Sequence, residues 1–152
     1  KNGYIVSAFD AAEKGLEKAR ELARLHHVDV NFFQADINEY ELSDEYDIIF
    51  SSGVFHYLTP NRREIFIHNL KEHTTMHGIH ALNVFVAKPF IEAAPDSEEA
   101  ELRNEPWYSG EMMRYYHDWI FHKYEEEIFD CNSGGIPHKH CMNRMVAEKL
   151  PD

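Results

Sequence analysis

The 152-residue sequence predicts an α/β fold, in which a doubly wound, mostly parallel sheet ends in an antiparallel pair of strands. Short β-rich apolar runs alternate with helical patterns over residues 4–86, which is typical of parallel strands joined by helices. The last two strand-like runs are joined by a short segment around residues 131–137, which is too short for a crossover helix. Because 43% of the residues are apolar, we expect one globular domain over residues 1–152.

The first three elements follow from changes in periodicity. Residues 4–9 form a short apolar run that ends at Asp10, which predicts a strand. Residues 11–27 have helical spacing of leucine and alanine, with Glu–Lys pairs on the outer face. Residues 28–33 predict a second strand, which ends close to Asp36.

The middle of the chain predicts two more strands around a helix. Residues 46–50 predict a continuous strand of the type buried in a parallel sheet, and they run into Ser51, Ser52 and Gly53. The helix predicted over residues 60–75 begins with a proline, which suits a first helical turn. We expect Gly78 to interrupt the chain before a fourth strand over residues 79–86.

The last third predicts a loop, a short helix and the antiparallel pair. Residues 87–108 are acidic and contain three prolines, which favours a loop or lid. A short helix is expected over residues 109–117. Residues 122–129 and 140–147 then predict the two antiparallel strands.

Charge and composition exclude several classes of partner. Lys and Arg number 15 against 27 Asp and Glu, and the formal charge of −12 argues against nucleic acid or an anionic membrane surface. The 11 histidines can move this charge towards −1 below about pH 6. No uncharged apolar run approaches the roughly 18 residues of a membrane helix, and no basic-then-apolar leader opens the chain. With only two cysteines, we expect a cytoplasmic protein.

Polar groups end three of the predicted strands: Asp10, Asp36 and the run from Ser51 to Gly53. Carboxyl ends of parallel strands meet at one rim of the sheet, where ligands bind. A carboxylate at Asp10 can accept both hydroxyls of a ribose, and one at Asp36 can accept from the amine of adenine. Asp10 alone is equally well explained as a helix N-cap. The three strand ends together favour an adenosine pocket.

Five segments of the sequence carry a family resemblance: Phe9-Asp10-Ala11 and residues 34–37, 46–58, 78–86 and 109–119. Together they resemble class I S-adenosylmethionine-dependent methyltransferases, whose fold is a Rossmann-like sheet. Residues 109–119 also resemble the G-E-L-x-x-Y-Y-x-x-W signature of the tellurite-resistance, TehB-like group. The resemblance implies a methyltransferase that uses S-adenosylmethionine and a small methyl acceptor, such as a metalloid oxyanion, a thiol or a metabolite.

The same resemblance implies a role for individual residues on the cofactor side. Asp10 and Ala11 would lie at the ribose, and Asp36 and Ile37 at the adenine. The three residues Ser51, Ser52 and Gly53 would line the methionine end of the cofactor.

On the acceptor side, His56 and Tyr57 would lie at the mouth of the site, and Arg114 and Tyr115 in a segment that covers it. We hypothesise that His56 or His138 acts as the base or positions the acceptor, and that Arg114 binds an anionic acceptor.

One departure from the family pattern concerns the glycine-rich D-x-G-x-G turn, which lets the backbone approach the cofactor. Here Gly3 only leads into the strand expected to be the second, so we expect the first strand, the glycine loop and the first helix to be missing. Loss of that central strand leaves two unpaired apolar strand edges. These edges predict a homo-oligomer or strand exchange.

A histidine-rich segment near the C-terminus contains potential metal ligands. His138 and His140 would share one face of a strand, and Cys131 and His117 could complete a zinc site. The spacing matches no closed zinc motif, so we predict no metal.

Two alternatives to a methyltransferase stay open at this stage. A truncated or catalytically inactive relative would act by binding or oligomerisation. A nicotinamide oxidoreductase would also bind ribose, but the antiparallel strand pair and the lack of G-x-G-x-x-G argue against it.

Overall fold

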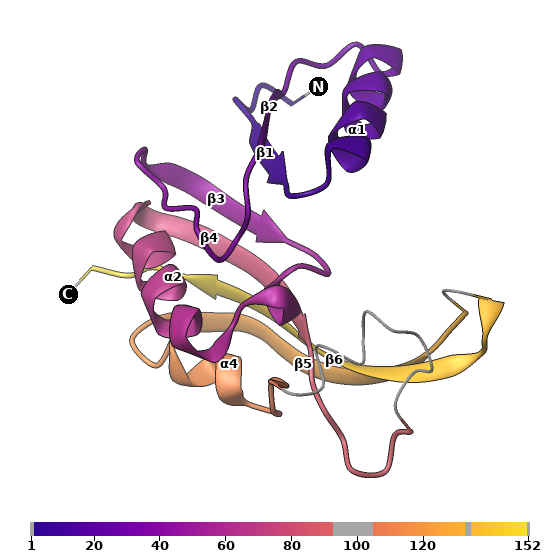
Figure 1. The fold of residues 1–152 in the computed structure, drawn as a ribbon. Helices are drawn as coiled ribbons and strands as arrows, with labels where there is room; N and C mark the ends of the chain where they lie inside the picture. Colours follow the sequence, from indigo (N-terminus) through magenta and orange to yellow (C-terminus); the bar gives the residue numbers. More distant parts are fainter. Residues whose placement is uncertain (1, 93–104, 133–134, 152) are drawn as a thin grey trace. The chain divides into compact units, whose positions relative to one another are not determined.

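The computed structural model describes residues 2–92, 105–132 and 135–151 (Figure 1). The chain divides into two compact units, Lys1–Tyr40 and Glu41–Asp152. Each unit is described separately below.

The first unit is a β-α-β segment. Strand β1 (Ser7–Asp10) pairs in parallel with β2 (Asn31–Gln34), and helix α1 (Glu13–Leu25) connects them and contacts both. Leu16 is the buried residue of α1. The chain returns parallel to itself because a helix crosses between the two strands, as the alternating pattern predicts.

The second unit contains a four-stranded sheet in the order β3-β4-β6-β5. Its strands are β3 (Tyr46–Ser51), β4 (Thr74–Phe85), β5 (Ile120–Cys131) and β6 (His138–Glu148). β3 and β4 are parallel, whereas β6 runs antiparallel to both β4 and β5. The predicted antiparallel pair at the C-terminus is therefore present, with β6 between β4 and β5.

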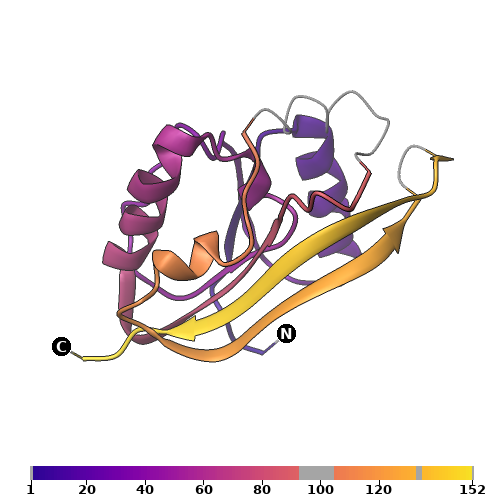
Figure 2. The same ribbon diagram turned by 90° about the horizontal axis from the view of Figure 1, so that it is seen from below.

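Helices α2 (Pro60–Glu72) and α4 (Glu111–Arg114) lie on the same side of this sheet, and the short 3-10 helix η1 (Phe55–Tyr57) precedes α2 (Figure 2). The core of the unit is rich in large apolar side chains from the helices, the sheet and the segment before α4. Its members include Phe55, Leu58, Phe66, Ile67, Leu70, Leu82, Val84, Trp107, Met112, Tyr116, Met145 and Ala147.

The expected interruption at Gly78 is wrong, because β4 begins at Thr74 and runs through the glycine. The amide of His77 donates to the Lys149 carbonyl, and the Lys149 amide donates to the Gly78 carbonyl, both at 3.0 Å. A Cβ at position 78 would lie 2.4 Å from Cγ2 of Thr74. Glycine therefore permits a crowded, irregular stretch of strand and does not end the strand.

Other boundaries differ from the predictions. The first strand begins at Ser7, and the helix expected over residues 109–117 is shortened to Glu111–Arg114. Much of the expected lid falls in residues 93–104, outside the described residues. Among the described residues, β1 pairs with β2 alone and β3 with β4 alone, so each has one edge without a partner strand there. No helix in the described part is long and apolar enough to span a bilayer.

Candidate functional site

In the first unit, the end of β1 is shaped by the carboxylate of Asp10. Its Oδ1 accepts from the amide of Ala12, the residue directly before α1, at 2.8 Å, and Asp10 is exposed. A Cβ at Gly15 would lie 3.2 Å from Oδ2, so the glycine lets the carboxylate lie against the first turn of α1. The carbonyl of Ala11 accepts from the Gln34 side chain at 2.8 Å, which ties the ends of the two strands together.

Asp36 lies two residues after the end of β2. Because Asp10 at the end of β1 is in register with Gln34 at the end of β2, Asp36 and Asp10 lie at the same edge of this strand pair. Its Oδ1 accepts from the Asn38 amide at 2.8 Å, which forms an Asx turn. The carboxylate is exposed, and Ile37 is buried beside it in the chain. The structure therefore brings two of the predicted cofactor carboxylates to one edge of the β1–β2 pair.

In the second unit, the turn after β3 is held by Asn83 of β4. The Gly53 amide donates to Asn83 Oδ1 at 2.7 Å, and the Asn83 amide group donates to Ser52 Oγ at 2.9 Å. Gly53 has a φ of 69°, and a Cβ there would meet no atom within 4 Å. The turn from Ser51 to Gly53 thus presents open backbone. Sequence reasoning missed Asn83, whose signal is a lone amide inside an apolar strand.

His56 lies in η1 with its ring against two aromatic neighbours. The centroid of its ring is 4.3 Å from that of Tyr57 and 4.6 Å from that of Phe85. Nδ1 is buried and has no hydrogen-bond partner among the described residues. Burial, with a smaller contribution from His140, lowers the pKa of His56 to about 4. The imidazole is therefore neutral near pH 7.

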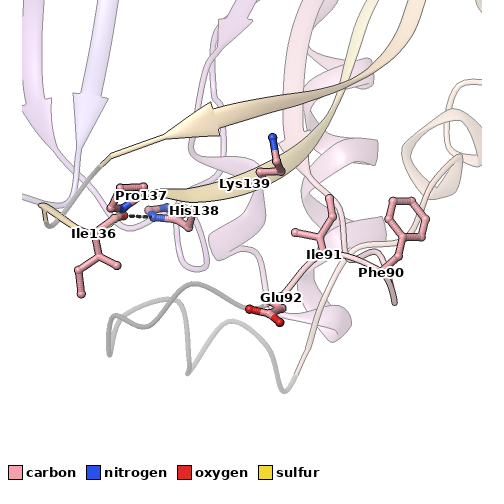
Figure 3. A pocket seen from close by; sticks show the side chains of 7 residues that line it. All are labelled: Phe90, Ile91, Glu92, Ile136, Pro137, His138 and Lys139. Atoms are coloured by element: carbon pink, nitrogen blue, oxygen red, sulfur yellow. Dashed lines mark hydrogen bonds between the residues drawn. The ribbon is translucent and has the colours of Figure 1, made fainter.

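The ring contacts of His56 with Phe85 continue from Phe85 to His140 in the β5–β6 hairpin. Phe85 stacks on His140 with centroids 4.7 Å apart, and His140 Nε2 lies 2.9 Å from His138 Nε2. His56 and His138, two candidates for acceptor chemistry, are thus connected through Phe85 and His140. His138 also lines a pocket of about 530 Å³ together with residues 90–92, 136, 137 and 139 (Figure 3).

Arg114 and Tyr115 lie at the C-terminal end of α4. The Arg114 guanidinium donates to the Tyr115 hydroxyl at 3.3 Å and lies 5.3 Å from the centroid of its ring. The hydrogen bond to Tyr115 is the largest of the effects that raise the pKa of Arg114. The side chain is exposed, so a permanent positive charge is presented at the surface of the unit.

The segment that contains these two residues is anchored by polar contacts of Glu111. Glu111 Oε1 accepts from Arg63 Nη1 at 2.8 Å, and Glu111 Oε2 accepts from the Tyr108 amide at 3.0 Å. The guanidinium of Arg63 lies 4.3 Å from the centroid of Trp107. Arg63 is 4% exposed, so this charge is buried but paired.

Further along the segment, the side chains enter the core. The Tyr116 hydroxyl lies 2.8 Å from His80 Nδ1, and the ring of Trp119 lies 4.5 Å from that of His80. Gly110 has a φ of 79°, and its amide donates to Asn143 Oδ1 at 3.2 Å. Most residues of the signature therefore hold α4 against the sheet, whereas the side chain of Arg114 is exposed to solvent.

Comparison with known proteins decides the family. The family model described as "Tellurite resistance protein TehB" matches residues 1–136. The chain belongs to the TehB family. The resemblance found in the sequence is thereby confirmed.

Curated relatives agree with this assignment. The chain is 29% identical over 150 residues to the probable S-adenosyl-L-methionine-dependent methyltransferase TehB of Haemophilus influenzae strain Rd, covering 97% of the chain and 50% of that protein. A second H. influenzae TehB, of strain 10810, is 28% identical with the same coverage. The chain spans about half the length of these relatives.

Solved structures confirm the methyltransferase-like fold. The crystal structure of TehB from H. influenzae matches with a TM-score of 0.81 and 25% identity, over 97% of this chain and 50% of that one. The N-methyltransferase NodS of Bradyrhizobium japonicum, solved with S-adenosyl-L-homocysteine, matches with a TM-score of 0.61 and 12% identity, over 94% of this chain and 66% of that one. The latter likeness concerns the fold alone.

Proposed function

We propose that the protein containing this chain is a cytoplasmic, S-adenosylmethionine-dependent methyltransferase of the tellurite-resistance type. The observation that carries the proposal is the family match over residues 1–136, which includes every polar strand end described above. The acceptor class is a small molecule: a metalloid oxyanion, a thiol or a metabolite. When bound, the cofactor supplies an electrophilic methyl group.

The cofactor-side residues fit such a ligand. The exposed carboxylates of Asp10 and Asp36 can accept from ribose hydroxyls and from an exocyclic amine, with Ala11 and Ile37 beside them. The open backbone at Gly53, next to Ser51 and Ser52, suits close approach by the methionine end. These assignments are proposals for each residue.

On the acceptor side, we assign His56 the role of base. Its neutral, buried imidazole can take the proton that a protonated acceptor loses when its lone pair bonds to the methyl carbon. Arg114, supported by Tyr115, would attract an anionic acceptor, and His138 would position it from the hairpin. These residues act by orienting the acceptor and by moving its proton.

The proposal is tested by calorimetric titration of S-adenosylhomocysteine into the protein containing this chain. We expect micromolar binding, weakened at least about tenfold by Asp10→Asn because an amide cannot replace both acceptor oxygens. Asp29→Asn, an exposed carboxylate in the same unit, is the matched control and should bind like the wild type. Absence of binding by folded protein, or unchanged affinity in Asp10→Asn, would contradict the assignment.

The alternative is a methyltransferase-like domain that acts by binding or oligomerisation. It predicts no S-adenosylhomocysteine formation from S-adenosylmethionine with tellurite, selenite or small thiols as acceptors. The unpartnered strand edges of β1 and β3 support the prediction of a homo-oligomer or strand exchange, which light scattering coupled to gel filtration tests.

A further inference from the structure

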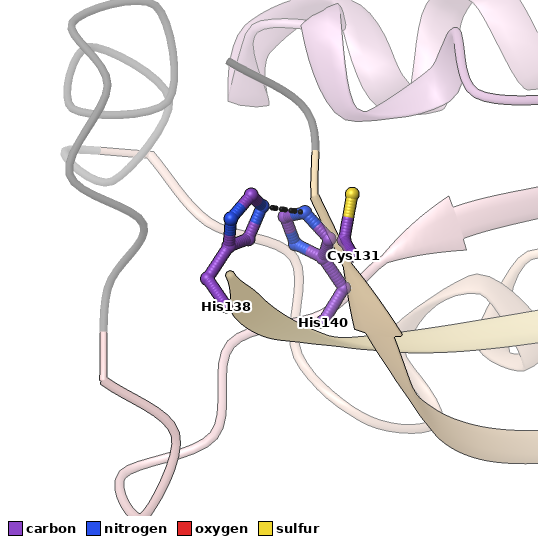
Figure 4. A group of neighbouring side chains, drawn as sticks. All are labelled: Cys131, His138 and His140. Atoms are coloured by element: carbon purple, nitrogen blue, oxygen red, sulfur yellow. Dashed lines mark hydrogen bonds between the residues drawn. The ribbon is translucent and has the colours of Figure 1, made fainter. Parts of the chain in front are cut away.

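Three potential metal ligands meet near the end of the β5–β6 hairpin. Cys131 of β5 is directly opposite His138 of β6, and His140 lies two residues further along the same face as His138. One ligand atom from each residue lies within 4.8 Å of the others (Figure 4). Strand register therefore assembles a set of two imidazoles and one thiol that the sequence spacing did not indicate.

The imidazole of His138 is already oriented as a ligand. Its Nδ1 lies 2.7 Å from the carbonyl oxygen of Ile136, and a carbonyl can only accept, so Nδ1 bears the proton. The lone pair is then on Nε2, which lies 2.9 Å from His140 Nε2. Metal-binding histidines commonly donate their other ring nitrogen to a backbone carbonyl in this way, which fixes tautomer and orientation.

His140 is held in place by aromatic contacts. Its ring stacks on Phe85 with 12° between the planes, and Phe129 lies 5.7 Å away on the neighbouring strand. All three candidate ligands are partly buried. Because the fold already restricts these side chains, they lose less conformational entropy when they bind a metal.

The distances fit a small, tetrahedral ion. Zinc bonds of about 2.0–2.3 Å imply separations of roughly 3.3–3.6 Å between ligand atoms. The present separations, 2.9 Å for the nitrogen pair and at most 4.8 Å within the group, lie on both sides of that range. Small rotations of the side chains bring them into it. Imidazole and thiolate donors favour zinc over calcium or magnesium, which prefer oxygen.

We propose that Cys131, His138 and His140 bind one zinc ion through a thiolate and two imidazole nitrogens. Binding releases the thiol proton to solvent. The hydrogen that His140 Nε2 shares with His138 Nε2 is exchanged through solvent for one on His140 Nδ1, so that both Nε2 lone pairs can bond to the ion. Three protein ligands leave one coordination position for water or a ligand. His138 also lines the pocket of about 530 Å³, which provides room beside the ion. The site shares His138 with the proposed acceptor site, but zinc binding can be measured without methyl transfer.

Cobalt(II) is the probe for this site, because its thiolate complexes have a charge-transfer band and its tetrahedral complexes have intense visible bands. Titration of the metal-free protein should show one Co²⁺ per chain with both features, and Zn²⁺ should displace it. Cys131→Ser should remove the charge-transfer band, and His140→Ala should weaken binding at least about tenfold. His68→Ala, which removes an exposed histidine of α2, is the matched control. Lack of stoichiometric binding, or unchanged spectra and affinity in both ligand variants, would overturn the proposal.

A second measurement needs no variant. Alkylation of Cys131 by iodoacetamide, followed by mass spectrometry, should be at least about tenfold slower when stoichiometric Zn²⁺ is present, because the thiolate is coordinated. Cys141, which is 2% exposed, serves as the internal control. An equal rate of Cys131 alkylation with and without Zn²⁺ would contradict the site.

Discussion

His80 of β4 is fully buried, and both of its ring nitrogens have partners. The Thr74 hydroxyl donates to the Leu70 carbonyl at 2.6 Å, so Thr74 Oγ1 accepts from His80 Nε2 at 2.7 Å. Nδ1 then accepts from the Tyr116 hydroxyl at 2.8 Å. Burial, and the charges of Lys71 and Lys149, lower the pKa of His80 to about 3. The network requires a neutral imidazole.

This histidine predicts acid sensitivity. Below pH 6.5 the unfolded chain takes up a proton at His80, whereas the folded chain does not until about pH 3. Stability should therefore fall as the pH drops from 6.5 towards 3, by up to about 1.4 kcal/mol per pH unit from this residue. Urea unfolding at pH 7.5, 6.0 and 5.0 measures the slope, which His80→Gln should reduce. His68→Gln, on the exposed face of α2, should leave it unchanged; an unaltered slope in His80→Gln contradicts the argument.

At the scale of elements, β4 shows how one small residue permits an irregular strand. Its pairing with β3 shifts register between Tyr46 and Ile48, and His77 has a φ of 63°. Gly78 lies in this stretch, where a Cβ would be 2.4 Å from Thr74 Cγ2 and 2.8 Å from the Thr75 carbonyl oxygen. The Thr75 oxygen belongs to the backbone, so it cannot turn away from an added Cβ as a flexible side chain could.

We therefore expect Gly78→Ala to destabilise the protein by about 1–3 kcal/mol through overpacking. Urea unfolding followed by tryptophan fluorescence measures the change. Met76→Ala, in the same strand and 53% exposed in the wild type, should stay within about 0.5 kcal/mol. A wild-type stability for Gly78→Ala would show that β4 can move at this point.

At the scale of the whole molecule, the charge is strongly negative and depends on histidine. The formal charge is −12 with neutral histidines, and the sequence pI is about 5.3. Since His56 and His80 have lowered pKa values, about 4 and about 3, they stay neutral at pH 5.5. With two of the 11 histidines neutral, protonation of histidine can raise the formal charge from −12 no further than −3, short of the −1 that composition suggests.

Loss of this charge should reduce solubility, because repulsion between molecules weakens. The equilibrium solubility of the 152-residue chain should fall several-fold between pH 7.5 and pH 5.5, while far-UV circular dichroism confirms that the chain stays folded. Bringing the sample back to pH 7.5 should restore the solubility and serves as the control. Equal or greater solubility at pH 5.5 would show that charge does not limit association.

Local patterns were enough to predict the elements and the ends of the strands. The alternation of β-rich and helical runs predicted β1, α1, β2 and β3, because periodicity reflects which side of an element is buried. The short segment before β6 was enough to predict an antiparallel pair. Asp10 and Asp36 were found for the same reason, since a polar residue directly after an apolar run marks the end of a strand.

Contacts between distant segments could not be read from those patterns. The burial of His56 against Phe85, and the support of Gly53 by Asn83, depend on how η1 and the β3 turn lie beside β4. The meeting of Cys131 with the hairpin histidines depends on the register of β5 and β6. Register and packing arise from the sum of many non-local contacts. A sequence read segment by segment therefore shows the candidate residues but not the neighbours that surround them.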